Sequence, residues 1–284
     1  MRIYHNFDLT EYNSYRVKAI CNLAFFPESE ADVLMFISEH PKFILLGSGH
    51  NVILSKRHYD IPFLIINGVL NRISLLNNHL VYVEAGAWMA DVAEFALKNS
   101  LSGIEMFWDI PSSLGGAVVM NAGASGDEIK DVIQEVRYFD LKAGIRKVLS
   151  AEELNFQYRN SFFQMNSENL IFSAILKLRS AKKEAIKKKM EEIKTNRELK
   201  QPKEYPNAGS VFKRPKAFYV GSMIEELGLK VYTVGGMKIS EKHGGFIVNF
   251  NNGTGEDVVK IIHYVQNCVH KVYGLELEIE QRIL

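Results

Sequence analysis

Residues 206–215, "PNAGSVFKRP", bring together side chains that could act on an anionic substrate. Ser210 is followed three and four residues later by Lys213 and Arg214. A serine held on a rigid backbone beside two cations suits a nucleophile or a proton donor for such a substrate. A nucleophile would also need a base; no histidine is close in the sequence, and His243 would have to approach in the fold. A polar loop explains the spacing more simply, so the chemistry needs further support.

A second candidate is Arg159, which lies in the aromatic segment "YRNSFF" (158–163). A guanidinium among aromatic rings is partly desolvated, and desolvation makes it a strong bidentate partner for a carboxylate. A structural arginine packed between aromatic side chains fits the same pattern equally well.

Two glycine-rich segments could approach a ligand with bare backbone. Residues 110–126, "IPSSLGGAVVMNAGASG", hold four glycines, three alanines and three serines, and residues 47–52 read "GSGHNV". Glycine costs conformational entropy and buries no side chain, so a dense cluster needs a reason that only bare backbone supplies. Val52 stands where a dinucleotide-binding fingerprint has its third glycine, and the residues after it look extended, which argues against a Rossmann fold. The loops, 47–51 and 112–126, could instead form backbone nests around one diphosphate without a helix dipole, or be structural turns.

The elements that must position these residues alternate between helix and strand patterns. Apolar spacing predicts helices over 28–40, 88–100 and 253–274. In the last of these, Thr254 is the expected cap, Asp257 completes a capping box and Gly274 ends the helix. Strands are predicted around the glycine turn of 42–54, in "FLIING", in "HLVYVEAGA", over 170–178, and over 275–284, where Leu275, Leu277 and Ile279 alternate with glutamates. The chain is therefore a mixed α/β protein.

A strongly charged segment separates the two α/β regions. Residues 180–203 contain eight lysines and one arginine against four glutamates. Ile186, Met190 and Ile193 fall at helical spacing, which predicts an amphipathic helix that joins two domains. Nucleic-acid binding is the weaker interpretation, because the segment lacks aromatic side chains that could stack on bases.

Composition limits the remaining classes of protein. With 284 residues, 47% of them hydrophobic, the chain can bury a large core in two or three domains. A net charge of +1 creates no global field toward nucleic acid or a membrane. Cys21 and Cys268 are far apart and lack metal-ligand spacing, which suits a reducing compartment. The first residues lack an apolar signal core and no run reaches transmembrane length, so we expect a cytoplasmic protein.

Six motifs, in this order, resemble the UDP-N-acetylenolpyruvoylglucosamine reductases, the flavoenzymes of early peptidoglycan synthesis. They are "LGSGHNVIL", "IPSSLGGAVVMNAGASG", "YRNSFF", "PNAGSVFKRP", "GLKVYTVGGMKISEKHGGFIVN" and "LELEIEQR", and the resemblance runs from about Asn6 to the C-terminus. It implies an FAD-binding domain of the vanillyl-alcohol-oxidase type and a smaller α/β substrate-binding domain. We expect the FAD-binding domain over 1–180, in lobes of about 1–60 and 61–180, a helical linker over 181–203, and the substrate-binding domain over 204–284, with its C-terminal strand returning to the active site.

The resemblance also implies the chemistry. NADPH would give a hydride to FAD, and the reduced flavin would pass it to the double bond of UDP-N-acetylglucosamine enolpyruvate, forming UDP-N-acetylmuramate. The family's serine, arginine and C-terminal glutamate fall on Ser210, Arg159 and Glu280. Arg159 and a protonated Glu280, its pKa raised by desolvation, would stabilise an enol-like intermediate. Ser210 would donate the proton.

Further residues are assigned to binding by the same resemblance. The two glycine loops would wrap the pyrophosphate of a noncovalent FAD with main-chain donors, through Gly47, Ser48, Gly49, His50, Asn51, Pro111, Ser112, Ser113, Gly115, Gly116, Asn121, Ala122 and Gly123. The substrate diphosphate would meet Lys213, Arg214, Lys230 and His243. We expect no metal, no nucleic-acid or membrane partner, and a monomer.

Several residues depart from the family pattern. Ser48 and His50 replace a usual Gly and Ser, Lys18 and Ala19 stand where Gly-Gly is common, "KHGGF" with Gly245 replaces "KHANF", Gln281 replaces Val, and the chain ends at Leu284 where a glycine usually follows. The short stretch after "YRNSFF" indicates the shorter subtype, without an extra tyrosine-bearing loop. Two alternatives stay open: an FAD oxidase of a sugar or alcohol, which the cations beside Ser210 disfavour, and a catalytically idle FAD- or nucleotide-binding module.

Overall fold

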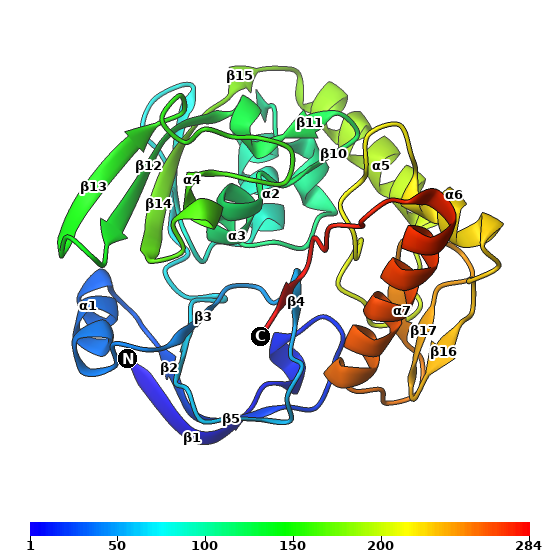
Figure 1. The fold of residues 1–284 in the computed structure, drawn as a ribbon. Helices are drawn as coiled ribbons and strands as arrows, with labels where there is room; N and C mark the ends of the chain where they lie inside the picture. The colour runs from blue at the N-terminus through cyan, green and yellow to red at the C-terminus, as the bar shows by residue number, and fades with distance from the viewer. The chain divides into compact units, whose positions relative to one another are not determined.

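The computed structural model describes all 284 residues, which group into two compact units (Figure 1). Unit 1 comprises Met1–Ile3, Phe25–Ser48 and Phe63–Asn196, and unit 2 comprises Tyr4–Ala24, Gly49–Pro62 and Arg197–Leu284. Both units are therefore discontinuous in sequence. Residues 4–24 and 49–62, which the domain prediction assigned to the N-terminal lobe, group by their contacts with the C-terminal residues.

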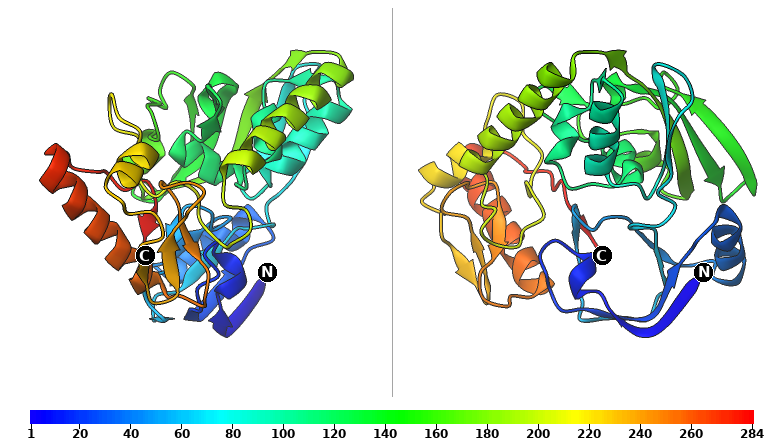
Figure 2. Two further views of the ribbon diagram at one scale, coloured as in Figure 1. Left: turned by 90° about the vertical axis from the view of Figure 1, so that its right-hand side faces the viewer. Right: turned by 180° about the vertical axis from the view of Figure 1, so that it is seen from behind.

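Unit 1 is built on an antiparallel sheet with the strand order β13-β12-β14-β8-β7. Its central strand, "NLIFSAILK", is buried along most of its length, as expected of a strand covered on both faces. Helices α2 (Met89–Lys98) and α3 (Leu114–Met120) lie on one face of this sheet (Figures 1 and 2). The strands are β7 (Ile73–Leu75), β8 (Leu80–Glu84), β12 (Ile133–Asp140), β13 (Ile145–Ser150) and β14 (Asn169–Lys177).

The same unit contains a parallel pair and several short elements. Strand β3 (Ile44–Leu46) pairs with β6 (Phe63–Ile65). Helix α1 (Glu30–Glu39) begins after Ser29, whose hydroxyl accepts the Asp32 N–H, so a helix predicted over 28–40 is confirmed. The short elements are β9 (Leu101–Ser102) paired with β15 (Arg179–Ser180), β10 (Gly123–Ala124) paired with β11 (Asp127–Glu128), α4 (Phe162–Met165), and the 3-10 turns Glu105–Trp108 and Ile129–Asp131.

Helix α5 (Lys183–Lys200) confirms the helix predicted in the charged segment. Its three apolar residues are buried: Ile186 and Met190 pack with Ala93 of α2, and Ile193 joins the main core of unit 1. Figure 2 shows α5 running along α2. The apolar stripe thus anchors most of this segment to unit 1, while its lysines other than the partly buried Lys189 remain exposed.

Unit 2 contains the antiparallel strands β16 (Thr233–Val234), β17 (Met237–Ile239) and β18 (Ile247–Asn249), with α7 (Gly255–Tyr273) in contact with β16 and β17. The predicted ends of α7 are confirmed, because Thr254 and Asp257 form the capping box and Gly274 has φ +63°. The other elements are the 3-10 turn Thr10–Tyr12, α6 (Val220–Glu226) and β5 (His58–Tyr59). Strand β5 pairs in parallel with the first residues of β2 (Ile20–Phe26). Strands β1 (Arg2–Asp8) and β2 each have residues in both units.

The C-terminal segment differs from its prediction. The continuous strand expected over 275–284 is wrong, because only β19 (Arg282–Ile283) is a strand, paired in parallel with β4 (Val52–Ile53). Residues 278–280 hydrogen bond instead to residues 211–213. The segment therefore changes partner along its length, and a change of partner interrupts the ladder that a continuous strand needs.

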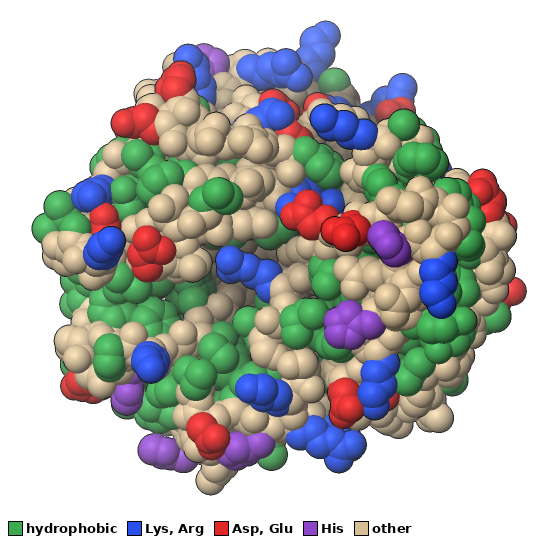
Figure 3. Space-filling view, viewed as in Figure 1, with side chains coloured by type: hydrophobic (Ala, Val, Ile, Leu, Met, Phe, Trp, Pro, Cys, Tyr) green, Lys and Arg blue, Asp and Glu red, His purple; other side chains and the backbone are tan.

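The surface charges and the hydropathy of the helices agree with what the composition of the chain predicts. Acidic and basic side chains are interspersed over the face drawn in Figure 3, as the net charge of +1 leads one to expect. Among the helices, none combines the length and the apolar character that a membrane span requires.

Candidate functional site

Arg159 lies at the tip of a tight turn. Gln157 and Asn160 exchange both backbone hydrogen bonds, at 3.0 and 3.1 Å, which leaves Tyr158 and Arg159 as the two turn residues. Arg159 has φ +52°, a conformation that costs free energy for any residue but glycine. Ser161 secures the turn, because its buried hydroxyl donates to the Val119 carbonyl at 2.8 Å. Backbone strain held in this way is typical of functional sites.

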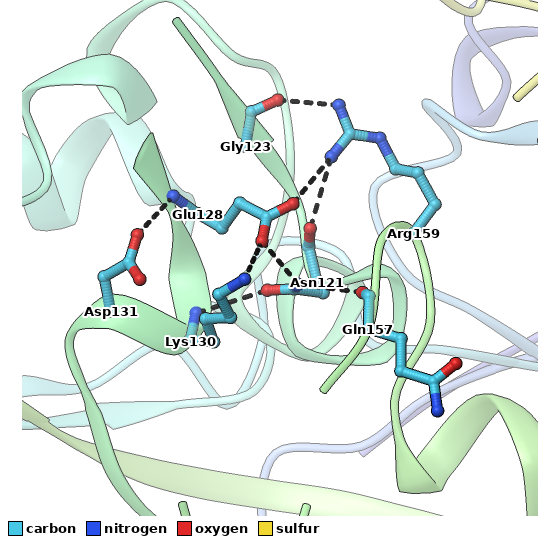
Figure 4. A network of polar contacts seen from close by, with 7 residues as sticks. All are labelled: Asn121, Gly123, Glu128, Lys130, Asp131, Gln157 and Arg159. Carbon is cyan, nitrogen blue, oxygen red and sulfur yellow. Dashed lines mark hydrogen bonds and ion pairs between the residues drawn. The ribbon is translucent and has the colours of Figure 1, made fainter. Parts of the chain in front are cut away.

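Backbone carbonyls orient the guanidinium of Arg159. Its Nη2 donates to the Gly123 carbonyl at 2.8 Å and its Nη1 to the Asn121 carbonyl at 3.3 Å, with Glu128 Oε1 3.9 Å away (Figure 4). The guanidinium carbon also lies 5.1 Å from the centroid of the Tyr158 ring. Only 18% of the side chain is exposed. A planar fork held by two carbonyls has a defined direction, which a flexible ammonium group would lack.

Asn121 joins the parts of this network. It ends α3 in the left-handed conformation, with φ 43°, and is fully buried. Its Nδ2 donates to Glu128 Oε2 at 3.0 Å and to the Gln157 carbonyl at 2.9 Å, and its Oδ1 accepts the Lys130 N–H at 3.3 Å (Figure 4). The side chain of Asn121, a residue predicted to bind FAD, therefore connects the end of α3, the β10–β11 hairpin and the Arg159 turn.

The second glycine segment is not a loop throughout. The expectation of a loop over 112–126 is wrong in its middle, because residues 114–120 form α3. The Leu114 N–H donates to the Ala87 carbonyl and the Gly115 N–H donates to the Ala85 carbonyl. The Ala122 N–H donates to the Ala117 carbonyl. Since the protein already satisfies these donors, this segment offers a diphosphate fewer main-chain N–H groups than the glycine content indicated.

The first glycine loop keeps its donors available. The N–H groups of Gly47, Ser48 and Gly49 hydrogen bond to no group of the protein. Gly49 has φ +72°, and a Cβ there would lie 2.2 Å from the Tyr12 carbonyl oxygen, so the loop requires glycine at this position. Adjacent unsatisfied N–H groups in such a turn form a concavity for an anion.

The two glycine segments meet within unit 1. Ser48 Oγ accepts the Ser113 N–H at 3.2 Å, and a Cβ on Gly47 would lie 2.9 Å from Ser113 Oγ. Beside them, the buried hydroxyl of Ser112 has no hydrogen-bond partner in the protein. A buried hydroxyl is rarely left unsatisfied, so Ser112 can bond to a ligand group or to an ordered water. The residues present therefore fit a diphosphate-containing cofactor such as FAD. The other predicted contacts adjoin these residues in the sequence: Pro111 precedes Ser112, and His50 and Asn51, which belong to unit 2, follow Gly49 and lead into β4.

Ser210 and Glu280 lie on neighbouring backbone segments of unit 2. The Glu280 N–H donates to the Val211 carbonyl at 2.8 Å, and the Lys213 N–H donates to the Glu278 backbone carbonyl at 2.9 Å. The side chain of Ser210 is exposed and makes no hydrogen bond with the protein. The structure therefore brings together two of the three predicted catalytic residues, whereas Arg159 belongs to unit 1.

Additional contacts hold this pair of segments. The Val211 N–H donates to the Gly245 carbonyl at 3.0 Å, so the serine segment is bonded on both edges. Asn51, predicted as a cofactor residue, donates through Nδ2 to the Glu280 carbonyl at 3.0 Å. The side chain of Asn51 thus fixes the backbone next to the predicted catalytic glutamate.

The predicted substrate cations already have partners in unit 2. Lys213 Nζ lies 2.5 Å from Glu278 Oε1, and Lys230 Nζ lies 2.8 Å from Glu225 Oε1. The Arg214 guanidinium lies 5.4 Å from the centroid of the Tyr219 ring. Glu278 and Glu225 are mostly exposed acids, so both ion pairs are weak enough to exchange for a more highly charged anion.

His243 is half-buried, and its Cε1 lies 3.6 Å from the position that a Cβ on Gly221 of α6 would take. Its Nδ1 accepts the Gly245 N–H at 3.1 Å, and its ring lies edge-on to Phe246 with centroids 4.7 Å apart. Burial lowers its pKa below the usual value, and the charge of Lys230 acts in the same direction. The lowered pKa and the hydrogen bond accepted by Nδ1 favour the neutral imidazole, and the ring is not hydrogen bonded to Ser210 in this structure.

Sequence reasoning missed the acidic and polar partners of the Arg159 turn. Glu128 ends the β10–β11 hairpin and Lys130 lies in the 3-10 turn that follows it, both about thirty residues before the arginine. Their spacing matches no motif, so no signal in the sequence connects them with Arg159.

Known proteins share both halves of this arrangement. Residues 22–149 match a family model described as an FAD binding domain, and residues 201–284 match one described as the C-terminal domain of UDP-N-acetylenolpyruvoylglucosamine reductase. Relatives named UDP-N-acetylenolpyruvoylglucosamine reductase include that of Francisella tularensis, which is 38% identical over 97% of this chain and 98% of the relative. The relative from Caldanaerobacter subterraneus is 39% identical over 100% of this chain and 94% of the relative. The crystal structure of the Thermus caldophilus reductase superposes with a TM-score of 0.84 at 29% identity, covering 99% of this chain and 98% of that one.

These similarities confirm the expected fold class, a mixed α/β chain with an FAD-binding domain of the vanillyl-alcohol-oxidase type and a C-terminal α/β domain. They extend over nearly the whole length of both the chain and its relatives. The chain therefore belongs to the UDP-N-acetylenolpyruvoylglucosamine reductase family of FAD-dependent oxidoreductases.

Proposed function

We propose that Arg159, Ser210 and Glu280 are the catalytic residues of the FAD-dependent reduction that family membership assigns to this chain. The reaction converts UDP-N-acetylglucosamine enolpyruvate into UDP-N-acetylmuramate, with NADPH as the hydride source. A hydride and a proton add across the enolpyruvyl double bond, so the enzyme needs a proton donor and a partner for the carboxylate. The observation that carries the assignment is the pairing of the Ser210 and Glu280 segments within the region matched by the family's C-terminal model.

The chemistry of each side chain suits a different role in the reaction. Ser210 has a hydroxyl that the protein leaves unbonded, which suits transfer of its proton to the substrate carbon. Arg159 has an oriented fork, which suits a carboxylate on which negative charge builds up. Glu280 would complete the stabilisation of the enol-like intermediate. FAD supplies the hydride chemistry when bound, and the N–H groups of Gly47, Ser48 and Gly49 would hold its diphosphate.

The substrate diphosphate would bind near the cations of unit 2. Lys213, Arg214 and Lys230 supply positive charge, and binding would exchange their acidic partners for phosphate oxygens. His243 contributes differently from the expectation of a cation. Because its Nδ1 accepts an N–H, its proton is on Nε2, and the neutral ring acts as a hydrogen-bond donor.

The cellular setting follows from this reaction. We propose a cytoplasmic monomer that supplies peptidoglycan precursor for cell shape and division and that needs no nucleic-acid or membrane partner. After α4, unit 1 continues only with β14 and β15 before α5 begins, which supports the shorter subtype without a further tyrosine-bearing loop.

Turnover with the two proposed substrates tests this function. We expect a yellow protein that oxidises NADPH only when UDP-N-acetylglucosamine enolpyruvate is present and that releases free FAD on acid precipitation. Absorbance at the NADPH band and mass detection of UDP-N-acetylmuramate measure turnover. Flavin reduction without product would indicate another oxidoreductase, and yellow colour kept in the precipitate would contradict noncovalent binding.

Gly116→Val should remove FAD without unfolding the protein. Gly116 is exposed, and a Cβ there would meet only Ser113 Oγ at 3.4 Å, an ordinary contact, so the apo protein should melt close to wild type. A β-branched side chain would, however, block the approach of a ligand to the backbone. The ratio of flavin to protein absorbance and the apo melting temperature measure the two effects.

The neighbouring glycine provides the matched control. Gly115 is buried, and a Cβ there would lie 3.3 Å from the Ala85 carbonyl oxygen, so Gly115→Val should lower the melting temperature itself. A Gly116→Val protein that carries a full complement of FAD would show that Gly116 does not face the cofactor.

A further inference from the structure

Gln281 is buried beside the segment that carries Ser210. Only 4% of its surface is exposed. Its Nε2 lies 3.0, 3.2 and 3.3 Å from the carbonyl oxygens of Ala208, Gly209 and Ser210. Its Oε1 accepts a hydrogen bond of 2.9 Å from the hydroxyl of Tyr15. Both ends of the amide are thus satisfied inside unit 2, and a satisfied buried amide fixes the groups that it joins.

The convergence of three carbonyls on one amide requires a turn. Consecutive carbonyls of an extended chain point in opposite directions, so they cannot all face the same donor. Gly209 has φ +79°, and no atom lies within 4 Å of the position of a Cβ. The conformation rather than the available space therefore requires glycine here, and it turns the carbonyls toward Gln281.

The other end of the serine segment is also tied to Tyr15. The Pro206 carbonyl accepts the Asn249 N–H at 2.9 Å, and Asn249 Nδ2 donates to the Tyr15 carbonyl at 2.8 Å. Tyr15 is completely buried, and this burial raises the pKa of its hydroxyl well above the usual value. The hydroxyl therefore stays protonated and continues to donate to Gln281.

We propose that Gln281 is a positioning residue for the proton transfer by Ser210, an inference that rests on the proposed function. Its amide, oriented by Tyr15, fixes the backbone of residues 208–210. Because the Ser210 hydroxyl makes no hydrogen bond with the protein, no side-chain partner fixes its oxygen, and the backbone sets the few positions that its χ1 rotamers can reach. Gln281 also follows Glu280, whose N–H bonds to the Val211 carbonyl, so the same stretch of backbone places both catalytic residues.

Separate measurement of the two half-reactions tests this role in the holoenzyme. Gln281→Met keeps the length of the side chain and removes its hydrogen bonds. We expect NADPH to reduce the flavin at nearly the wild-type rate, and reoxidation by UDP-N-acetylglucosamine enolpyruvate to slow about 10- to 100-fold, because a small displacement of a reacting group has effects of this size. Stopped-flow absorbance of the flavin follows both phases. A purely structural role would slow both phases or neither.

Two further variants separate positioning from general damage. Tyr15→Phe keeps the amide and the packing, so reoxidation should slow less, and adding Tyr15→Phe to Gln281→Met should have little additional effect because the two residues act as a unit. Gln266→Met removes a comparable bond, from Nε2 to the Leu277 carbonyl at 2.8 Å, and should leave both phases near wild type.

Hydrogen exchange of residues 207–212 measures the order of the segment without any substrate. Loss of one net hydrogen bond should speed exchange about five- to tenfold in Gln281→Met, with no change in Gln266→Met. Normal reoxidation in Gln281→Met, or equal slowing of both phases, would overturn the positioning role. If the substrate failed to reoxidise even the wild-type flavin, the proposed function would fall together with the role in proton transfer, and the exchange rates would still report whether Gln281 orders the segment.

Discussion

Ser210→Ala should leave reduction of the flavin by NADPH nearly unchanged and slow its reoxidation by UDP-N-acetylglucosamine enolpyruvate about 100- to 10,000-fold, the usual effect of losing a positioned proton donor. Hydride transfer from NADPH needs no proton from Ser210, whereas completion of the enolpyruvyl reduction does. Because the hydroxyl makes no hydrogen bond with the protein, its removal should not disturb the backbone that surrounds it. Stopped-flow absorbance resolves both phases in one sample.

A second serine of unit 2 serves as the control. Ser222 in α6 is also exposed, and Ser222→Ala should match wild type in both phases. Ser210→Cys should recover part of the lost rate, since a thiol also donates a proton. Reoxidation of Ser210→Ala at the wild-type rate would eliminate Ser210 as the acid, and equal slowing of both phases would indicate a displaced site.

Arg159→Lys should lower the rate of reoxidation by about two orders of magnitude, because a charged hydrogen bond lost from a buried transition state is worth roughly 2 to 4 kcal/mol. Lysine keeps the charge but loses the planar fork. The structure shows what the fork depends on: two backbone carbonyls, of Asn121 and Gly123, orient the guanidinium through different nitrogens. One ammonium group cannot hold both carbonyls and face a carboxylate in a defined direction.

The same contacts give Arg159 a structural role that the experiment must separate from catalysis. FAD content and melting temperature should therefore be measured beside the rates, and Arg137→Lys on the exposed side of β12 provides a control of the same chemistry. A stable, flavinated Arg159→Lys enzyme with a large loss in reoxidation supports the catalytic role. Rates close to wild type would return Arg159 to a purely structural one.

Local patterns in the sequence correctly predicted several of the helices. Helix α7 was predicted with its cap and its terminal glycine because these signals act within one turn of helix. The stripe of Ile186, Met190 and Ile193 likewise predicted the buried face of α5. Both predictions succeeded because an amphipathic helix is defined by residues three and four positions apart.

The sequence was less informative about the glycine segments and the C-terminal end. Glycine content indicated bare backbone in 112–126 but did not reveal that α3 forms there and satisfies several of its N–H groups. Alternation predicted one strand over 275–284, whereas residues 278–280 bond to 211–213 and only Arg282–Ile283 pair with β4. Alternation reports which side chains are buried, and it does not report how many partners supply the hydrogen bonds.

By itself, the sequence determined the family, the candidate catalytic residues and the main helices, because each depends on residue identities close together along the chain. Only the tertiary structure decided that Glu280 lies beside the Ser210 segment, that two carbonyls aim Arg159, and that Gln281 joins Tyr15 to the serine segment. Gln281 in particular stood out in the sequence only as a departure from the family pattern. Its partners lie 71 to 73 and 266 positions away, and hydrogen bonds of 2.9 to 3.3 Å across such separations are set by the packing of the whole unit rather than by any local preference.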